Sequence, residues 1–503
     1  MMLQLNVDIL FLIFEELKND TKSFYSYLLV NKTWCIMTVP ILWRDPNIIS
    51  LSDEAKRKLF DVIFLHLSKE SRDILKSRGI SNLFSETYQH PLFNYISFWK
   101  HLDLFFIEGL IFQGNIKGSN IFIIKNEIMK LFIKGSNIFI IKNEIMKLFI
   151  NENTRFIHLY IAQNFNYKVH SIPGAEHCLS GLESFSCRSC VDQSILEGLS
   201  SICKSIKRLK FFVESFNVNI NFGIIKLIEA QKNLNEVHLF NYSVTKSFEG
   251  LIEKSLIKHA DTIQYLRIRS APVTKFLSYL VNLSSLEIEF MDPWNNLNNF
   301  ENFSVPNLKI LRTKQVPYNI LVNLIENTKG YLTEINTFYN FSYEIVNIEL
   351  IIQAIYKNCL NLKYLLFSSN NSNSIIPEFE TLLIKCQFLN ELILLIHDHN
   401  DYAFSWDKLF IVLAKSSPIS LLRFKFYSIS MFNLKDIALF FYNWKNRNPM
   451  TLGICNNNSY FNKRSKNKPL EDLCEKYKLK GIIKKYIIEY TKLVDYKDFT
   501  AFN

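Results

Sequence analysis

A phrase of bulky apolar residues with the spacing Leu-x-x-Leu-x-Leu recurs along this chain from residue 156 onward. Consecutive copies begin 20 to 32 residues apart, and other apolar residues replace leucine at some positions. A period in this range is typical of stacked supersecondary units, because one unit cannot bury its apolar face alone. A chain of 503 residues is also too long for one conventional core. The copies begin at Phe156, Leu182, Ile206, Leu234, Ile263, Leu283, Leu308, Leu332, Leu362, Leu389 and Leu421.

The phrase resembles the leucine-rich repeat, in which each repeat contains one strand and one helix. Stretches with helical spacing of apolar residues lie between the phrases, as at 224–230, 348–355 and 408–414. The resemblance implies an α/β fold: an irregular solenoid over 156–430, with parallel strands on the concave side and helices on the convex side. We expect residues 431–503 to form a cap and a helical tail. The repeat also favours Asn or Cys at its ninth position, as in Asn164, Cys190, Asn340 and Asn370.

The first 46 residues carry a second informative pattern. Apolar residues at positions 10, 13, 14 and 17 share one face of a short helix, and two further short segments each contain a tryptophan, Trp34 or Trp43. A three-helix unit this small removes too little surface from water to bury such large side chains alone. We therefore expect residues 1–46 to be a docking module that needs a partner surface.

The order and spacing of its residues resemble the F-box, through Leu-x-x-Asp-Ile-Leu, Ile-Phe-x-x-Leu, Val-x-x-x-Trp and Leu-Trp-Arg within residues 5–44. Asn6 stands where the family usually has proline, and asparagine is also a good helix N-cap. The resemblance implies a three-helix module that binds a Skp-type adaptor, and through it the cullin scaffold of an SCF-type ubiquitin ligase. The adaptor-binding residues that it implies are Leu5, Ile9, Leu10, Ile13, Phe14, Val30, Trp34, Leu42 and Trp43.

The chain would then be the substrate-recognition subunit, whose repeats hold a client protein for ubiquitination. Two other functions stay open. The chain could be a scaffold or protein-binding solenoid without a ubiquitin role, with its N-terminal helices packed back on the linker. It could also be a basic nucleic-acid-binding protein, although the net charge of +11 is spread along the chain and no segment resembles a nucleic-acid-binding motif.

Strand alternation indicates where a client would bind. The leucine positions of each phrase face the core, so the residues between them face the concave side, where neighbouring strands lie about 4.8 Å apart. Three successive strands then give a positive, negative and positive ladder, whose charges either satisfy one another or contact a client. The client-binding candidates are Arg267, Arg269, Glu287, Glu289, Arg312 and Lys314, and further concave residues are Arg208, Lys210, His238, Tyr364, Arg423 and Lys425.

Residues 47–155 form a linker that we expect to be mostly helical, including 53–67 and 93–110. The linker contains a tandem duplication, because residues 134–150 repeat residues 117–133 without one change. Structural repeats diverge while keeping only their pattern, so identity indicates a recent duplication or a gene-model artefact. Seventeen residues do not make a whole number of helical turns. We therefore predict two helices broken near Gly135 and Ser136, with one copy poorly packed.

No pattern indicates an enzyme, a cofactor or a metal. The chain has no phosphate-binding glycine loop, nucleophile elbow or HExxH-type site. His177, Cys178, Cys187 and Cys190 could suggest zinc, but the repeat explains both later cysteines. The residues 397–401 are better interpreted as a polar loop than as a metal site. Nine scattered cysteines and the lack of a long apolar segment favour a cytoplasmic or nuclear protein and no membrane contact.

Overall fold

In the computed structural model the chain forms two compact units, Met1–Asn235 and Glu236–Asn503. In both units short parallel strands alternate with helices along the chain, so the prediction of an α/β fold with parallel strands is confirmed. The structure describes residues 7–17, 20–47, 51–78, 80, 90–114, 136–162, 165, 167–188, 190–213, 221–241, 246–290, 305–339, 347–370, 373–397, 404–428, 432–456 and 468–489.

Unit 1 begins with helices and continues with strand and helix pairs. Strands β1 to β4 pair in chain order, each parallel to the next. The elements of unit 1 are α1 (Val7–Glu16), α2 (Thr21–Tyr27), α3 (Lys32–Leu42), α4 (Asp53–Leu65), α5 (Lys69–Ser77), η1 (Tyr95–Phe98), β1 (His101–Asp103), α6 (Leu104–Gly114), α8 (Ser136–Phe149), β2 (His158–Ile161), η2 (Val169–Ser171), α9 (Ala175–Leu179), β3 (Ser184–Arg188), α10 (Gln193–Ile202), β4 (Arg208–Val213) and α11 (Phe222–Glu229).

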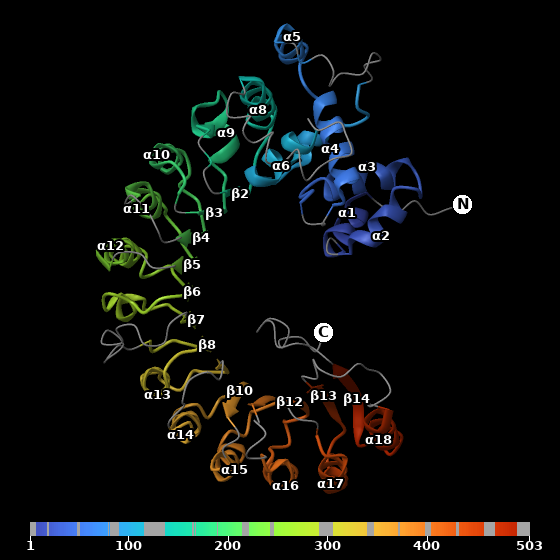
Figure 1. The fold of residues 1–503 in the computed structure, drawn as a ribbon, viewed down its shortest axis with the longest axis vertical. Helices are drawn as coiled ribbons and strands as arrows, with labels where there is room; N and C mark the ends of the chain where they lie inside the picture. Colours follow the sequence, from blue (N-terminus) through green and yellow to red (C-terminus); the bar gives the residue numbers. More distant parts are fainter. Residues whose placement is uncertain are drawn as a thin grey trace, which may run out of the picture. The chain divides into compact units, whose positions relative to one another are not determined.

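Unit 2 repeats the same alternation, and its strands β5 to β14 also pair in chain order and in parallel. Within this unit the helices lie on one side of the strands (Figure 1). Its elements are β5 (Glu236–Asn241), α12 (Lys246–Ile257), β6 (Tyr265–Ile268), η3 (Phe276–Tyr279), β7 (Ser285–Glu289), β8 (Ile310–Lys314), α13 (Tyr318–Glu326), β9 (Glu334–Phe338), α14 (Glu349–Asn358), β10 (Tyr364–Asn370), α15 (Ile375–Lys385), β11 (Glu391–His397), α16 (Trp406–Ser416), β12 (Arg423–Ser428), α17 (Leu434–Trp444), β13 (Met450–Asn456), α18 (Lys468–Leu479) and β14 (Ile483–Glu489).

Each apolar phrase begins two residues before a strand, so the eleven phrases correspond to strands β2 to β12. The phrase Leu389, Leu392 and Leu394 shows the rule, because all three side chains are fully buried and lead into or lie on β11. Three strands lie outside the phrases. Strand β1 falls in the linker that we expected to be mostly helical, and β13 and β14 fall in the tail.

A backbone pattern joins one repeat to the next where each strand begins. The carbonyl oxygen of Lys100 accepts hydrogen bonds from the amides of Ile157 and His158, at 2.8 and 3.1 Å. The carbonyl oxygens of Ile157 and Gln264 each accept two amides of the following repeat in the same way. These bonds satisfy backbone groups that burial would otherwise leave unpaired, so they fix the stacking distance of the repeats.

Asparagine side chains support this stacking in unit 2. Asn282 donates to the carbonyl of Asp261 at 2.8 Å, and Asn307 donates to that of Val281 at 2.8 Å. Each of these asparagines directly precedes the first leucine of a phrase. Of the four ninth-position residues, Cys190 is exposed and Asn370 is the last residue of β10, whereas Asn164 and Asn340 lie outside the described residues.

The linker and the duplication are described in part. Helix α4 covers most of the predicted helix at 53–67, whereas the stretch 93–110 contains η1, β1 and the start of α6 instead of one helix. Within the second copy of the duplication, α8 begins at Ser136, where the helix break was predicted. The first copy, 117–133, lies outside the described residues.

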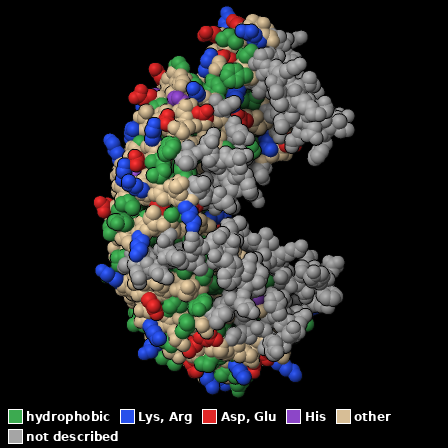
Figure 2. Space-filling model, turned by 60° about the vertical axis from the view of Figure 1, so that its left-hand side comes forward, with side chains coloured by type: hydrophobic (Ala, Val, Ile, Leu, Met, Phe, Trp, Pro, Cys, Tyr) green, Lys and Arg blue, Asp and Glu red, His purple; other side chains and the backbone are tan. Residues whose placement is uncertain are grey.

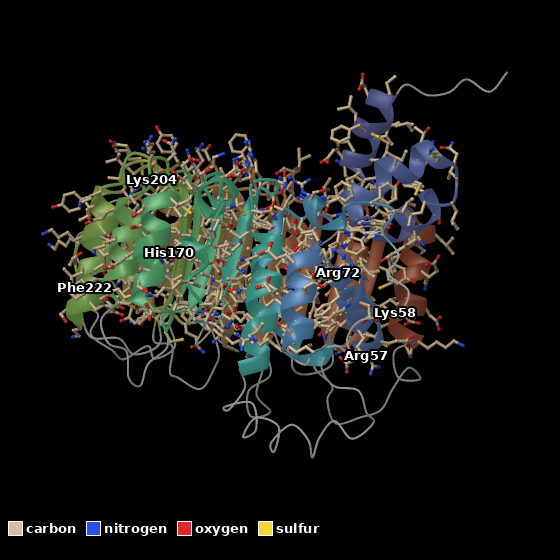
Figure 3. The ribbon with its side chains drawn as sticks, turned by 90° about the horizontal axis from the view of Figure 1, so that it is seen from above. Arg57, Lys58, Arg72, His170, Lys204 and Phe222 are labelled. Atoms are coloured by element: carbon tan, nitrogen blue, oxygen red, sulfur yellow. The ribbon has the colours of Figure 1, made fainter. Side chains whose placement is uncertain are left out.

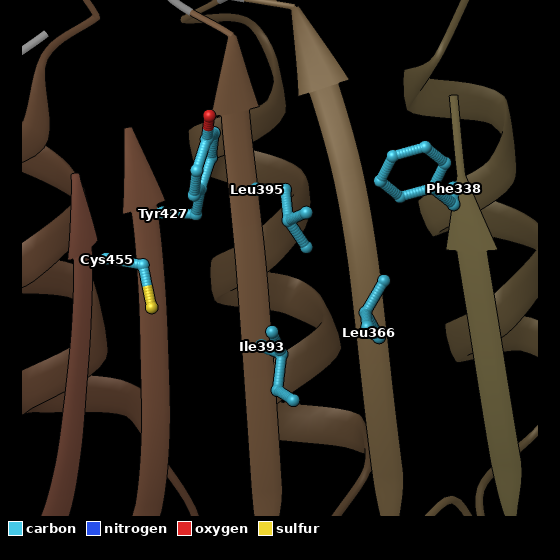
Figure 4. Close-up of a cluster of buried hydrophobic side chains, with 6 residues drawn as sticks. All are labelled: Phe338, Leu366, Ile393, Leu395, Tyr427 and Cys455. Carbon is cyan, nitrogen blue, oxygen red and sulfur yellow. The ribbon is translucent and has the colours of Figure 1, made fainter. Parts of the chain in front are cut away.

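Part of the sheet in unit 2 is apolar on both faces. The six side chains in Figure 4 lie on the face of the strands away from the helices and are at most 7% exposed. Strand β11 accordingly has every residue buried, which is typical of parallel strands covered on both sides. These side chains are Phe338, Leu366, Ile393, Leu395, Tyr427 and Cys455.

Candidate functional site

The three N-terminal helices form a small core of their own. Leu10, Phe14 and Phe24 are buried, and Trp34 and Tyr27 pack against them. The Phe14 ring lies 5.7 Å from Phe24, 5.2 Å from Trp34 and 5.3 Å from Tyr27, between ring centroids. Such aromatic pairs add about 0.5–1.5 kcal/mol each beyond the burial of their surface. Phe14 therefore holds the module together.

Polar caps define where these helices begin. The Asn31 side chain accepts a hydrogen bond from the amide of Trp34 at 3.0 Å, and Asp20 accepts one from the amide of Ser23 at 3.3 Å. Both bonds satisfy amides of a first helical turn that have no partner within the helix. Helices α1 and α2 both contact α3. The cap expected at Asn6 lies outside the described residues.

Helix α1 leaves much of its apolar surface uncovered. Its residues 9–14 are all apolar, but only Leu10 and Phe14 are buried. Leu12 is 65% exposed, and Ile9 and Ile13 are 48% and 41% exposed. A helix that is apolar on all sides is normally covered on all sides. Other exposed large apolar side chains of the module are Phe11, Leu17, Tyr25, Leu29, Val30 and Ile36, and together with Ile9, Leu12 and Ile13 they form the surface that we call the apolar docking surface.

The residues that the F-box resemblance implied lie in different places in the structure. Leu10 and Phe14 belong to the internal core, with Trp34 and Leu42 packed against it. Ile9, Ile13 and Val30 lie on the apolar docking surface. Trp43 instead stacks on Tyr95, with ring centroids 4.3 Å apart, and Leu5 lies outside the described residues.

Six residues of the apolar docking surface were not among the predicted adaptor-binding residues, namely Phe11, Leu12, Leu17, Tyr25, Leu29 and Ile36. The sequence pattern had indicated one helical stripe at positions 10, 13, 14 and 17. The unbroken apolar run 9–14 was the signal that could have identified Phe11 and Leu12, because it is wider than one core-facing stripe.

The docking module joins the first strand through backbone bonds. The carbonyl oxygen of Arg44 accepts hydrogen bonds from the amides of Lys100 and His101, at 2.9 and 3.3 Å. The same two-amide pattern joins other repeats, as at Lys100, Ile157 and Gln264, so Arg44 occupies the position of a preceding repeat. Asp45 also lies 2.9 Å from the His101 ring nitrogen, and Asn47 donates to Asp103 at 2.6 Å. The module is therefore anchored to β1 by several bonds.

The charge ladder of unit 2 is internally paired. The register places Arg267 beside Glu287 and Glu287 beside Arg312 on neighbouring strands. The carboxylate of Glu289 lies 2.8 Å from Arg269, 2.9 Å from Lys314 and 3.3 Å from Arg267. Glu289 is only 7% exposed, so these charges interact with little screening by water.

The remaining charges of the ladder also have partners. Arg267 lies 3.1 Å from Glu287, which accepts a hydrogen bond from the Tyr265 hydroxyl at 2.7 Å. Arg312 lies 2.8 Å from Glu334. Burial alone would raise the pKa of Glu289, but the hydrogen bond and charge of Lys314 and the charges of both arginines lower it overall. The charges of the ladder are therefore paired within the sheet.

Among the other concave candidates of unit 2, His238 and Lys425 are buried, and Tyr364 packs against the apolar cluster of Figure 4. Burial raises the pKa of the Tyr364 phenol. Arg423 is more exposed and pairs with Glu391 at 3.1 Å. In unit 1, Arg208 and Lys210 lie half-buried on β4, at alternate positions of one face of the strand.

His158 of β2 gives unit 1 a measurable pH dependence. Burial, followed by the charges of His101 and Arg208, lowers the pKa of His158 from 6.5 to about 4, against a smaller opposite effect of Asp45 and Glu183. Between these two values the unfolded chain binds a proton that the folded chain does not, so the free energy of unfolding falls as the pH falls. We expect the urea midpoint of the β1 to β4 region to decrease between neutral pH and about pH 5.5, where most carboxylates are still ionised.

Pulsed hydrogen exchange with mass spectrometry would measure this midpoint. The variant His158→Asn removes the titrating group and should lose most of the decrease, while His177→Asn, at an exposed histidine of the same unit, should keep it. An unchanged decrease in His158→Asn would assign the effect to another group.

The described residues contain no group of three or more His, Cys, Asp or Glu that could hold a metal ion. Cys187 is buried, and burial raises the pKa of the Cys178 thiol to about 11. His177 instead accepts a hydrogen bond from Arg155 at 3.1 Å. His397 is buried at the end of β11, and residues 398–401 lie outside the described residues. All nine cysteines are free thiols.

Basic side chains do not gather on the face of the molecule in Figure 2, where blue Lys and Arg side chains are scattered among acidic and other ones. A search of the described helices found none with the length and apolar character of a membrane span. Comparison with known proteins gave no further assignment, because neither a family model nor a curated protein matches this chain.

Proposed function

We propose that this chain is the substrate-recognition subunit of an SCF-type ubiquitin ligase. Its N-terminal module would bind a Skp-type adaptor, and through it a cullin scaffold, while its leucine-rich-repeat-like array binds a client protein. The observation that carries the proposal is the apolar docking surface, which lies on a module whose own core is already complete. The side chains of that surface are exposed and are not members of the buried core cluster, so their chemistry fits a partner protein.

The energetics of the docking surface favour a protein partner. Covering one large apolar side chain fully contributes about 1.5–3 kcal/mol. Leu12, Ile9 and Ile13 lie within about one turn of one helix, so a partner groove could cover them together. The i, i+3 and i+4 spacing of these three exposed apolar side chains places them on one face of the helix, which is typical of an interaction site.

The junction at Arg44 supports a receptor function. The module continues the backbone pattern of the repeats, so it is held against β1 by the carbonyl of Arg44 and by Asp45 and Asn47. A receptor of this kind acts by proximity, because a client held near the conjugating enzyme has a high effective concentration. A fixed junction narrows the positions that the client samples, which raises this concentration further.

Co-purification with a Skp-type adaptor tests the proposal. We expect the full chain to retain the adaptor on a column, and the variant Leu12→Glu with Ile13→Glu to lose it, by a factor of about 100 or more in affinity, since two buried contacts become desolvated charges. Both side chains are exposed in the full chain, so the substitutions should not unfold the module.

The matched control is Leu92→Glu with Ile419→Glu, at two side chains that are 83% exposed and lie outside the module. This variant should keep adaptor binding. Hydrogen exchange of α1 to α3 would verify that the first variant is folded. If the unmodified chain does not bind the adaptor, or if both variants bind equally well, the receptor proposal is wrong and a scaffold without a ubiquitin role becomes the better interpretation.

A further inference from the structure

Strands β1 to β4 of unit 1 present a polar face opposite their buried side. The register aligns His101, His158, Ser184 and Arg208 in one row across the four strands. The next residues on each strand, including Leu159 and Leu209, are buried. A second polar row follows two residues along each strand and contains Asp103, Tyr160, Ser186 and Lys210.

Several polar side chains on strands β2 to β4 of this face have no polar partner in the described part of the chain. The side chains of Arg208 and Lys210 have no ion-pair partner in the described part of the chain, and both are half-buried. The hydroxyls of Tyr160, Ser184 and Ser186 likewise have no hydrogen-bond partner there. Five polar groups that can all donate therefore lie on three adjacent strands, which are about 4.8 Å apart.

The carboxylates near this face are already engaged. Glu183, which directly precedes β3, pairs with Lys207 at 3.0 Å. Asp103 accepts hydrogen bonds from Asn47 and from the amide of Phe106, at 2.6 and 2.9 Å. The paired ladder of unit 2, in which Glu289 holds three cations, shows how this fold neutralises strand charges when they serve packing. Among the described residues of unit 1, no carboxylate forms an ion pair with Arg208 or Lys210.

The spacing of Arg208 and Lys210 along β4 matches that of alternate residues in an extended peptide. Arg208 and Lys210 are two residues apart on one strand, so their backbones are separated by about 6.6 Å. An extended peptide places alternate side chains on one side at the same separation. From this match we infer that the β2 to β4 face binds an extended acidic segment, with carboxylates at alternate positions pairing with Arg208 and Lys210 and with the hydroxyls of Tyr160, Ser184 and Ser186 assisting. The inference rests on the proposed function, because the acidic segment is assigned to the client.

A protein segment fits this face better than a nucleic acid does. Two cations and three hydroxyls suit a few carboxylates, whereas nucleic-acid affinity comes mainly from many phosphate contacts along a continuous basic surface.

Fluorescence anisotropy with the full chain tests the inference without the adaptor. The probe is a labelled peptide with glutamate at alternate positions, and the comparison peptide has glutamine at the same positions. We expect the glutamate peptide to bind, and the variant Arg208→Glu with Lys210→Glu to weaken binding by about tenfold or more, because attraction becomes repulsion at both positions. The milder variant Arg208→Gln with Lys210→Gln should weaken it less, and added salt should weaken binding to the unmodified chain.

The matched control is Arg57→Glu with Lys58→Glu, which reverses the same number of charges on the exposed surface of α4 (Figure 3). This variant should bind the glutamate peptide as the unmodified chain does. Equal weakening by the control, equal binding of the glutamine peptide, or no binding at all would overturn the inference. Tighter binding of single-stranded RNA with the same dependence on Arg208 and Lys210 would overturn it in favour of a nucleic-acid site.

The two proposals fail separately. Loss of adaptor co-purification with intact peptide binding would reject the ubiquitin role and leave an acidic-peptide-binding scaffold. Intact adaptor binding without peptide binding would leave the receptor proposal standing and reject only this client class.

Discussion

Replacing Phe14 by alanine is expected to unfold the docking module while the repeats keep their structure. Phe14 is fully buried and contacts Phe24, Tyr27 and Trp34, which come from the two other helices. Removing a buried phenylalanine ring costs about 3–5 kcal/mol, through lost burial and the cavity left behind. A module of this size has only a few kcal/mol of stability of its own, roughly 0.05–0.15 kcal/mol per residue. The loss is therefore comparable to its whole stability.

Hydrogen exchange would measure the effect element by element. In Phe14→Ala the amides of α1, α2 and α3 should lose most of their protection, while those of β9 to β12 keep theirs. Leu12→Ala is the matched control, because Leu12 lies on the same helix but is 65% exposed, and its truncation should change stability by less than about 0.5 kcal/mol. Similar protection loss in both variants, or in neither, would show that Phe14 does not hold the module together.

The contrast between buried Phe14 and exposed Leu12 shows what an apolar helical pattern can predict from sequence and what it cannot. The apolar stripe identified a helix over residues 7–17, and helix α1 covers Val7–Glu16. The pattern did not show which apolar residues would be internal, since that depends on how α2 and α3 cross α1. Leu10 and Phe14 face those helices, and Ile13 does not.

The repeating phrase predicted strand positions well, because its apolar spacing is set by the alternation of a strand and by the packing of each strand on its helix. It did not identify β1 and β13, whose phrases begin with neither the leucine nor the isoleucine or phenylalanine of the identified copies. The positions equivalent to the first leucine are Trp99 before β1 and Pro449 before β13, according to the strand register. The period alone would have located Pro449, which lies 28 residues after Leu421, but not Trp99, which lies 57 residues before Phe156.

The junction between the docking module and β1 left no side-chain signal in the sequence. The junction at Arg44 uses a backbone carbonyl, which every residue has.

The apolar second face of β11 did leave a signal in the sequence, because the run Leu392–Ile396 is apolar at successive positions and not only at alternate ones. A continuous run of this kind predicts a strand buried on both faces.

Glu289→Gln is expected to destabilise strands β6 to β8 by roughly 3 kcal/mol, the lower end of the range for breaking a buried ion pair. The Glu289 carboxylate is buried and lies within 3.3 Å of Arg267, Arg269 and Lys314. Glutamine keeps the size of the side chain but removes its charge, so three cations would face one another with little water to screen them. Because Arg267 and Arg269 also lie over the Phe240 ring, at 5.1 and 4.7 Å, they cannot both turn to solvent without losing that contact.

Hydrogen exchange of the β6, β7 and β8 amides would report this loss locally, since a chain of two units does not unfold in one step. The control Glu475→Gln removes a carboxylate whose pair with Lys478 is nearly half exposed on both sides, and it should cost less than about 1 kcal/mol. Adding Lys314→Gln to Glu289→Gln removes one of the stranded cations, so the double variant should be less destabilised than the sum of its single changes. If Glu289→Gln costs no more than the control, the ladder does not stabilise the sheet, and its charges would be available to a client.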